Sequence, residues 1–163
     1  MGLKPCFDAK KVFLILYFFA FFIYFIIGLQ PADAIYQKVD SSLEIPKINL
    51  VSDVTRLQLE NGELITPDSI VGSFSGSPHK TLLIGHSTSV FKELHKLNLR
   101  DVFKYKDQVY RISRIDMVLK NDISMSELLS TSERDTVIIM TCAGKNLGAG
   151  DSTHRLILTG VSK

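Results

Sequence analysis

The stretch that decides the fold is TVIIMTC, residues 136–142. It carries no charge, and its apolar side chains fall on both of the alternating faces that an extended chain presents. A strand with one wet face would alternate apolar with polar residues, so this pattern predicts a strand buried on both sides in the middle of a sheet. The stretch ends on Cys142, a residue type that can carry chemistry.

Working outward, the rest of the chain from Leu43 onward consists mostly of short β-like runs between turn residues. The runs predicted as strands are residues 43–51, 54–59, 80–84, 102–105, 109–119 and 155–161. Pro46 places the first run near a sheet edge or a bulge, because proline has no N–H to donate to a ladder. Residues 64–80 contain too many prolines and glycines for an assignment.

Helical signals in this part of the chain are few. Phe91, Leu94 and Leu97 are three apart, which predicts an amphipathic helix over residues 89–97. Ser124 followed by Glu127 predicts a helical turn over residues 124–129. A chain with so many short strands and so few helices is mainly β, either a closed or nearly closed barrel or a β-sandwich, and periodicity does not separate the two.

An uncharged run of eighteen residues, Val12–Leu29, predicts a membrane segment. At about 1.5 Å per helical residue it spans about 27 Å, close to the hydrocarbon thickness of a bilayer. Lysines precede the run, so the N-terminus is expected inside. The predicted organisation is a cytoplasmic tip (1–11), a transmembrane anchor (12–29), a linker (30–42) and an extracytoplasmic domain (43–163).

A cleaved signal peptide is the alternative, because Ala32, Asp33 and Ala34 form a small-x-small pattern. Either reading exports the remaining chain. The formal charge of +2 belongs to the inner tip, which has three lysines and one aspartate, so 16 basic and 16 acidic residues remain beyond it. A neutral exported domain argues against a nucleic-acid partner, which would require a basic surface.

Cysteine usage gives the first functional indication. Cys6 and Cys142 fall on opposite sides of the predicted membrane, so they cannot pair with each other. A single cysteine in an exported domain can form an intermolecular disulfide, act as a reactive sulfur, or simply pack as a small apolar residue. Composition leaves these three readings open.

Three residues that could act together stand at the ends of predicted strands. Cys142 ends one strand, His86 follows residues 80–85, and Arg155 begins the last strand. A cysteine nucleophile requires an imidazole partner and a donor for the oxyanion of the tetrahedral intermediate. These residue types can fill the three roles, although a histidine or an arginine at a strand end is also an ordinary surface residue.

Other histidines are available for the same role, namely His79, His95 and His154. In an extended segment His154 and Arg155 point to opposite faces, so both cannot address one thiol. The residues alone therefore leave the triad as one possibility.

Four islands of sequence together resemble the sortase family, in order and spacing: IPKI (45–48), LLIGHS (82–87), TCAG (141–144) and HRLILTG (154–160). The resemblance covers residues 43–163 and implies an eight-stranded sortase barrel behind a single N-terminal transmembrane helix. It implies a cysteine transpeptidase that cleaves a Leu-Pro-X-Thr-Gly-like sorting signal of surface proteins and transfers them to a cell-wall or precursor amine on the outer face of a bacterial membrane.

The resemblance also assigns roles to individual residues. It implies that Cys142 forms the thioester acyl-enzyme, that His86 is the acid and base, and that Arg155 holds the substrate and stabilises the oxyanion. It places Thr141 and Ala143 against the substrate. No cofactor is expected for this chain, and no carboxylate cluster is convincing as a calcium site, so calcium dependence stays open.

The chain departs from the family pattern in several places. Where sortases often have Thr-Leu-X-Thr-Cys, this chain has Ile138 in place of the first threonine. A glycine-rich segment over residues 143–153 is expected to form a mobile loop. No Asp-Pro-aromatic lid precedes the barrel, so class A, D, E or F is favoured over the pilus-polymerising class C.

Two rival functions remain for comparison. The L,D-transpeptidases also use an exported cysteine, but their motif carries Ser-His-Gly just upstream, which residues 137–140 lack. A membrane-tethered β-barrel binding module, or a degenerate sortase that only holds signal peptides, would have an unreactive thiol.

Overall fold

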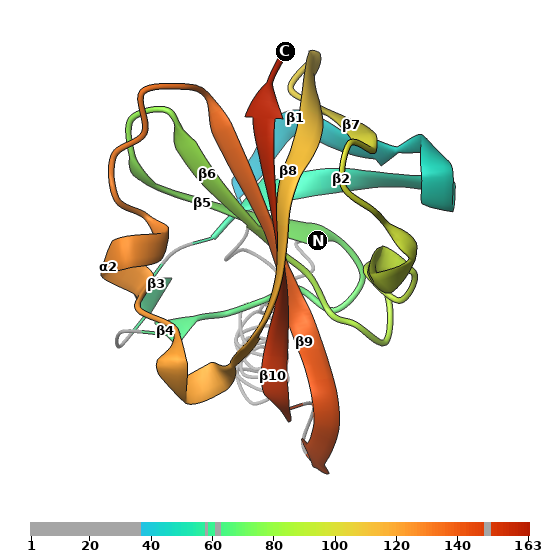
Figure 1. Cartoon of the computed structure of the whole chain (residues 1–163), viewed down its shortest axis with the longest axis vertical. Coiled ribbons are helices and arrows are strands. Elements are labelled where there is room, and N and C mark those ends of the chain that lie inside the picture. The colour runs from blue at the N-terminus through green and yellow to red at the C-terminus, as the bar shows by residue number, and fades with distance from the viewer. Residues whose placement is uncertain (1–36, 58, 61–62, 149–150) are drawn as a thin grey trace, which may run out of the picture. The chain divides into compact units, whose positions relative to one another are not determined.

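Eight strands close into a barrel in the computed structural model, which describes residues 37–57, 59–60, 63–148 and 151–163 (Figure 1). Around the barrel the strand order is β1-β2-β5-β6-β9-β10-β8-β7. The strands are β1 (Gln37–Ile45), β2 (Leu50–Arg56), β5 (Val71–Ser77), β6 (Lys80–Ile84), β7 (Val102–Tyr105), β8 (Gln108–Leu119), β9 (Thr136–Gly148) and β10 (Asp151–Ser162).

Only two of the eight neighbouring pairs are parallel, β2 with β5 and β6 with β9. The sequence predicted a barrel or a sandwich, and the resemblance to sortases an eight-stranded barrel; the closed barrel is confirmed. The two connections between parallel strands carry most of the remaining short elements. These are the two-stranded sheet of β3 (Leu59–Glu60) and β4 (Glu63–Leu64), and the turns η3 (Leu94–Lys96), η4 (Lys120–Asp122) and α2 (Met125–Leu128).

The predicted membrane anchor at residues 12–29 and the tip at residues 1–11 lie outside the described residues. In the part of the chain that the structure describes, no helix is long and apolar enough to cross a membrane. Strand β1 begins at Gln37, within the stretch that the sequence assigned to the linker.

The stretch at residues 136–142 lies where its pattern predicts. It forms the first half of β9, between β6 and β10, and residues 136–141 are all buried. Ile139 belongs to the core inside the barrel. Ile138 and Met140, on the other face, belong to a smaller apolar cluster outside the barrel wall, against which Leu128 and Leu129 pack. The strand is thus covered on both sides, as predicted.

Residues 43–51 and 71–77 differ from the prediction. Residues 43–51 are not one strand: η2 (Pro46–Ile48) separates β1 from β2, and the turn ends at Asn49 with φ of 51°. Proline suits this place because it needs no hydrogen-bond partner at the start of a turn. Strand β5 was not predicted at all, since Gly72 and Gly76 within it have the composition of a loop.

The amphipathic helix predicted over residues 89–97 is wrong. The segment is a series of turns with one short 3-10 element, η3. Phe91, Leu94 and Leu97 are nevertheless buried in the barrel core. The spacing thus predicted correctly that these three side chains are buried. The backbone N–H groups of Leu94, Lys96 and Leu97 each donate to the carbonyl three residues earlier, which is the 3-10 pattern and not the α-helical one.

The glycine-rich segment at residues 143–153 is mostly a β-hairpin. Strand β9 continues to Gly148 and β10 begins at Asp151, so the pair extends as an arm beyond the barrel (Figure 1). Register shifts on β10 near Ser152 mark where this arm departs from regular pairing. The helical turn predicted at residues 124–129 is confirmed as α2, whose N-cap is Ser124.

Candidate active site

The two-residue repeat of the strands decides which side chains leave the barrel interior. Leu83, Ile139 and Leu156 face inward and belong to the core. Their neighbours Leu82, Ile138, Met140 and Ile157 face outward and form the outer cluster. Cys142 lies two residues after Met140 and Arg155 two residues before Ile157, so the strand period directs both to the outer side of the wall. His86 follows Leu82 and Ile84 in the same alternation, two residues past the end of β6.

Cys142 and Arg155 are direct partners across the β9–β10 pair. Opposite residues on neighbouring antiparallel strands have Cβ atoms about 4.5–5.5 Å apart on the same face. The ladder therefore sets the Cβ atoms of Cys142 and Arg155 side by side. Cys142 is partly buried and the Arg155 side chain is 15% exposed, and both residues line the groove described below.

Hydrogen bonds of Gly85 hold the backbone that precedes His86 against β9, next to Cys142. The Gly85 N–H donates to the Met140 carbonyl at 3.4 Å, and the Thr141 hydroxyl donates to the Gly85 carbonyl at 2.7 Å. A Cβ on Gly85 would lie 2.5 Å from Val90, so no other residue fits there without displacement. Since Thr141 precedes the cysteine and Gly85 precedes the histidine, one hydrogen bond fixes the two strand ends relative to each other.

The turn after β6 completes the support of His86. Its carbonyl accepts from the Ser89 N–H at 3.3 Å and from the Phe91 N–H at 3.0 Å. The imidazole itself is about one-third exposed, and its Nε2 lies 3.9 Å from a carboxylate oxygen of Asp68. Asp68 is fully exposed, and an ion pair at that distance in water contributes little.

Arg155 is bound back onto the start of its own strand. One terminal nitrogen donates to the carbonyls of Ser152 and His154 at 2.9 and 3.0 Å, and the other donates to a carboxylate oxygen of Asp151 at 2.9 Å. Lys120 donates to the second oxygen of the same carboxylate at 2.5 Å. The hydrogen bonds from Lys120 and then Arg155 hold the pKa of Asp151 well below its ordinary value of 3.8, so this carboxylate stays ionised.

A groove of about 940 Å³ is lined by all three predicted catalytic residues. Most of the remaining lining is apolar and comes from β4 and the segment after it, from the barrel strands β5, β6 and β9, and from the α2 region: Leu64, Thr66, Phe74, Ile84, Ile123, Met125, Leu129 and Met140. Such a groove suits an extended, mostly apolar peptide with its reactive carbonyl beside Cys142.

The two residues that the family resemblance placed against the substrate lie in different surroundings. Thr141 lines the groove, yet its side chain is only 4% exposed and its hydroxyl is bonded to Gly85. Ala143 packs against the barrel core, on the face opposite to Cys142. Substrate contact by either residue stays a prediction.

The alternative histidines, His79, His95 and His154, are not among the residues that line this groove. His79 is exposed and lies 2.7 Å from Asp135. His154 faces away from Arg155, as an extended segment requires, and its Nδ1 lies 2.8 Å from the Thr153 hydroxyl. That imidazole also covers Gly144, whose φ is +79° and whose added Cβ would lie 2.6 Å from Nδ1.

Sequence reasoning missed Asp151 and Lys120, the charged neighbours of Arg155. Asp151 stands four residues before Arg155, a spacing that puts two side chains on one face of a regular strand, but the register shifts on either side of Ser152 interrupt that regularity. Lys120 is distant in sequence, and only the pairing of β8 with β10 brings it near. Among the described residues, no group of three or more His, Cys, Asp or Glu side chains is arranged to hold a metal ion.

Comparison with known proteins identifies the family from the sequence itself. Residues 43–163 match the sortase domain profile, which covers the whole described barrel except the first part of β1. No curated protein matches the chain by sequence.

Solved structures of low sequence identity share the fold. A lid mutant of sortase A from Corynebacterium diphtheriae has a TM-score of 0.62 at 19% identity, covering 87% of this chain and 78% of that one. Sortase C-1 from Actinomyces oris has a TM-score of 0.61 at 23% identity, with 86% and 79% covered. Sortase C from Clostridium perfringens has a TM-score of 0.58 at 20% identity, with 97% and 92% covered. Since sortases A and C both occur among these structures, the likeness does not separate the classes.

Proposed function

Because this chain belongs to the sortase family, a family of cysteine transpeptidases, we propose that it cleaves a Leu-Pro-X-Thr-Gly-like sorting signal and transfers the upstream protein to a cell-wall or precursor amine. The observation that supports this most is that Cys142, His86 and Arg155 line one largely apolar groove. The proposed catalytic side chains therefore line the same groove that would hold the peptide.

In the first half-reaction the sulfur of Cys142 attacks the threonine carbonyl of the signal. The carbonyl oxygen takes up the negative charge of the tetrahedral intermediate, and the guanidinium of Arg155 stabilises it by donated hydrogen bonds. The imidazolium of His86 protonates the departing glycine amine as the C–N bond breaks. A thioester between Cys142 and the threonine remains, with His86 neutral.

In the second half-reaction an amine attacks the thioester carbonyl. His86 accepts a proton from that amine, the C–S bond breaks, and a new amide forms while the starting charges of Cys142 and His86 are restored. The net change exchanges one peptide bond for another. Outside a cell no ATP is supplied, and the thioester conserves the energy of the cleaved bond for the ligation.

The proposed location follows from the sequence of residues 1–42. With an anchor at residues 12–29 and an inside N-terminus, the groove would lie on the outer face of a bacterial membrane, where sorting-signal proteins emerge and wall amines are available. A retained anchor keeps the enzyme beside both substrates.

We assign the chain to the class A, D, E or F type rather than to the pilus-polymerising class C. The support is the sequence before the barrel, which has no Asp-Pro-aromatic lid. A mixture of sorting-signal protein and pilin-like lysine substrates would test the class: transfer to a wall-type amine without polymer formation supports the assignment.

Trapping the acyl-enzyme tests the proposed reaction directly. The full chain in detergent is incubated with a library of Leu-Pro-X-Thr-Gly pentapeptides, and mass spectrometry locates the added mass. We expect a thioester on Cys142, none in Cys142→Ala, and an unchanged yield in Cys6→Ala, the matched cysteine control. Transpeptidation that persists in Cys142→Ala would overturn the proposal.

The partners of the cysteine are tested by turnover. Arg155→Ala should slow turnover by about 10²–10³-fold, the usual cost of losing an oxyanion donor. His86→Ala should lose most activity, whereas His79→Ala, exposed and outside the groove, should keep it.

The non-enzymatic rival is tested by the reactivity of the thiol. If the chain is only a binding module, a small thiosulfonate should label Cys142 slowly, and no sorting peptide should protect it.

A further inference from the structure

The start of β10 carries a carboxylate whose oxygens are both occupied. One oxygen of Asp151 accepts from the Arg155 guanidinium at 2.9 Å and from the Ser152 N–H at 2.8 Å. The other oxygen accepts from the Nζ of Lys120 at 2.5 Å. Asp151 therefore connects a residue of the active-site strand to a residue of η4, which follows β8 and lines the same groove.

The remaining donors of Arg155 are available for a substrate. A guanidinium has five N–H donors. Three are used by Asp151, Ser152 and His154. Among the contacts of the described residues that leaves two, on Nε and on one terminal nitrogen. An anchored guanidinium with two donors left is arranged to bind a carbonyl oxygen without first searching for its orientation.

The charges explain why Lys120 belongs to the arrangement. An isolated Asp–Arg pair is neutral, and it would weaken the attraction of the guanidinium for a developing oxyanion. With Lys120 on the second oxygen, the group of three carries a net charge of +1. The carboxylate can then hold Arg155 in place while the site keeps the positive charge that the reaction requires.

We propose that Asp151 is a positioning residue that fixes the Arg155 guanidinium beside Cys142, and that Lys120 compensates its charge. This inference rests on the proposed function. In the proposed reaction Asp151 and Lys120 touch neither the sulfur of Cys142 nor the peptide carbonyl, and they act only through Arg155.

The test measures alkylation of Cys142 by iodoacetate, an anionic reagent attracted by a nearby cation, with neutral iodoacetamide as reference. Rates are compared for the full chain in detergent at low ionic strength, in Cys6→Ala so that one thiol reacts. Asp151→Ala is made in two backgrounds, with Arg155 present and in Arg155→Ala. Asp122→Ala, an exposed acidic residue of η4, is the matched control.

If Asp151 acts through Arg155, Asp151→Ala lowers the iodoacetate to iodoacetamide ratio about fivefold where Arg155 is present, because the guanidinium leaves its place. In Arg155→Ala the same substitution leaves the ratio unchanged or raises it, because only a negative charge is lost. A change that is equal in both backgrounds, or no change in either, would overturn the inference. Asp151→Asn, which keeps the shape of the side chain, repeats the comparison in case the alanine variant does not fold.

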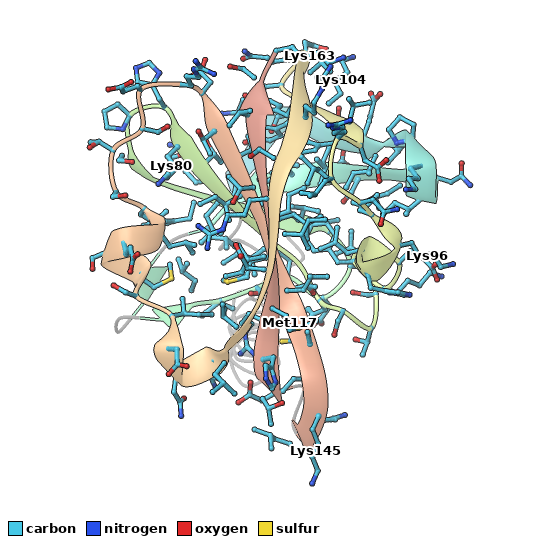
Figure 2. The ribbon with its side chains drawn as sticks, viewed as in Figure 1. Lys80, Lys96, Lys104, Met117, Lys145 and Lys163 are labelled. Carbon is cyan, nitrogen blue, oxygen red and sulfur yellow. The ribbon has the colours of Figure 1, made fainter. Side chains whose placement is uncertain are left out.

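Lys120 is tested by its charge. Lys120→Met should lower both the alkylation ratio and peptide turnover several-fold, and Lys120→Arg should restore them. The control is Lys145→Met, which removes an exposed lysine of β9 in the arm that β9 and β10 form beyond the barrel (Figure 2). This substitution should change neither the alkylation ratio nor peptide turnover. Equal effects of Lys120→Met and Lys145→Met would contradict the role of Lys120.

The two proposals can fail separately. If the wild-type chain transfers no peptide with any amine, the proposed function is wrong, whereas the alkylation comparison still decides whether Asp151 positions Arg155. If peptide transfer occurs and Asp151→Ala leaves the iodoacetate to iodoacetamide ratio unchanged, only the inference about Asp151 is wrong.

Discussion

The two halves of the β9–β10 pair are built differently although they are one continuous ladder. Residues 136–141 of β9 are buried on both faces, and Leu156, Ile157 and Leu158 beside them are buried as well. Beyond Cys142 the same strand is exposed from Gly144 to Gly148. The barrel half is held by apolar packing, and the arm half by hydrogen bonds and ion pairs around Asp151 and Thr153.

The candidate site lies at the boundary between these two halves. Cys142 and Arg155 take their positions from the rigid barrel half, while the charged surroundings of Arg155 come from the arm half. We therefore expect the substitutions that lower stability to differ from those that alter reactivity. Changes in the barrel half should unfold the protein, and changes in the arm half should alter the chemistry of a protein that remains folded.

Ile139→Ala should produce the largest loss of stability, because Ile139 is fully buried between β6 and β10. Removing the side chain leaves a cavity in a packed core, and the free energy of unfolding should fall by about 2–5 kcal/mol. Urea denaturation followed by circular dichroism measures it. A loss below about 1 kcal/mol would show that the barrel half does not carry the stability.

Thr141→Val tests the junction itself. The substitution keeps the shape but removes the hydroxyl that donates to Gly85, and the unfolding free energy should fall by about 1–3 kcal/mol while Thr141→Ser retains it. Peptide turnover should fall with it, because Gly85 positions His86. A rise in KM with unchanged stability would instead favour the substrate contact that the family resemblance predicted.

The pH dependence of stability should report the arm half. The folded pKa of Asp151 is depressed, so its stabilising effect is present above its ordinary value of 3.8 and is lost as the pH falls below it. The Tm difference between the wild-type chain and Asp151→Asn should therefore be constant from pH 7 to about 4 and shrink below that. The effect is modest and should weaken with salt, since the carboxylate is partly exposed. A Tm difference that grows in acid would contradict this assignment.

Leu147→Ala should have the smallest effect. Leu147 is 60% exposed on the arm, and a substitution at such a site usually changes stability by no more than about 0.5 kcal/mol. The same urea experiment measures it beside Ile139→Ala. A loss comparable with that of Ile139→Ala would remove the distinction between the two halves.

The sequence by itself determined the strand at residues 136–142 and the β-rich class, and it offered Cys142, His86 and Arg155 as one possible set of catalytic residues. These follow from local causes: an apolar run on both faces requires cover on both sides, and residue types at strand ends are visible in any sequence. The family resemblance then chose His86 among four histidines and the barrel over the sandwich.

Only the tertiary structure decided the rest. Residues 89–97 pack as turns because neighbours inside the barrel determine their backbone, and β5 forms because β2 and β6 pair with it despite its glycines. The meeting of Lys120, Asp151 and Arg155 depends on the register of β8, β9 and β10, which joins residues far apart in sequence. Contacts of that kind arise from closure of the barrel, and no local pattern encodes them.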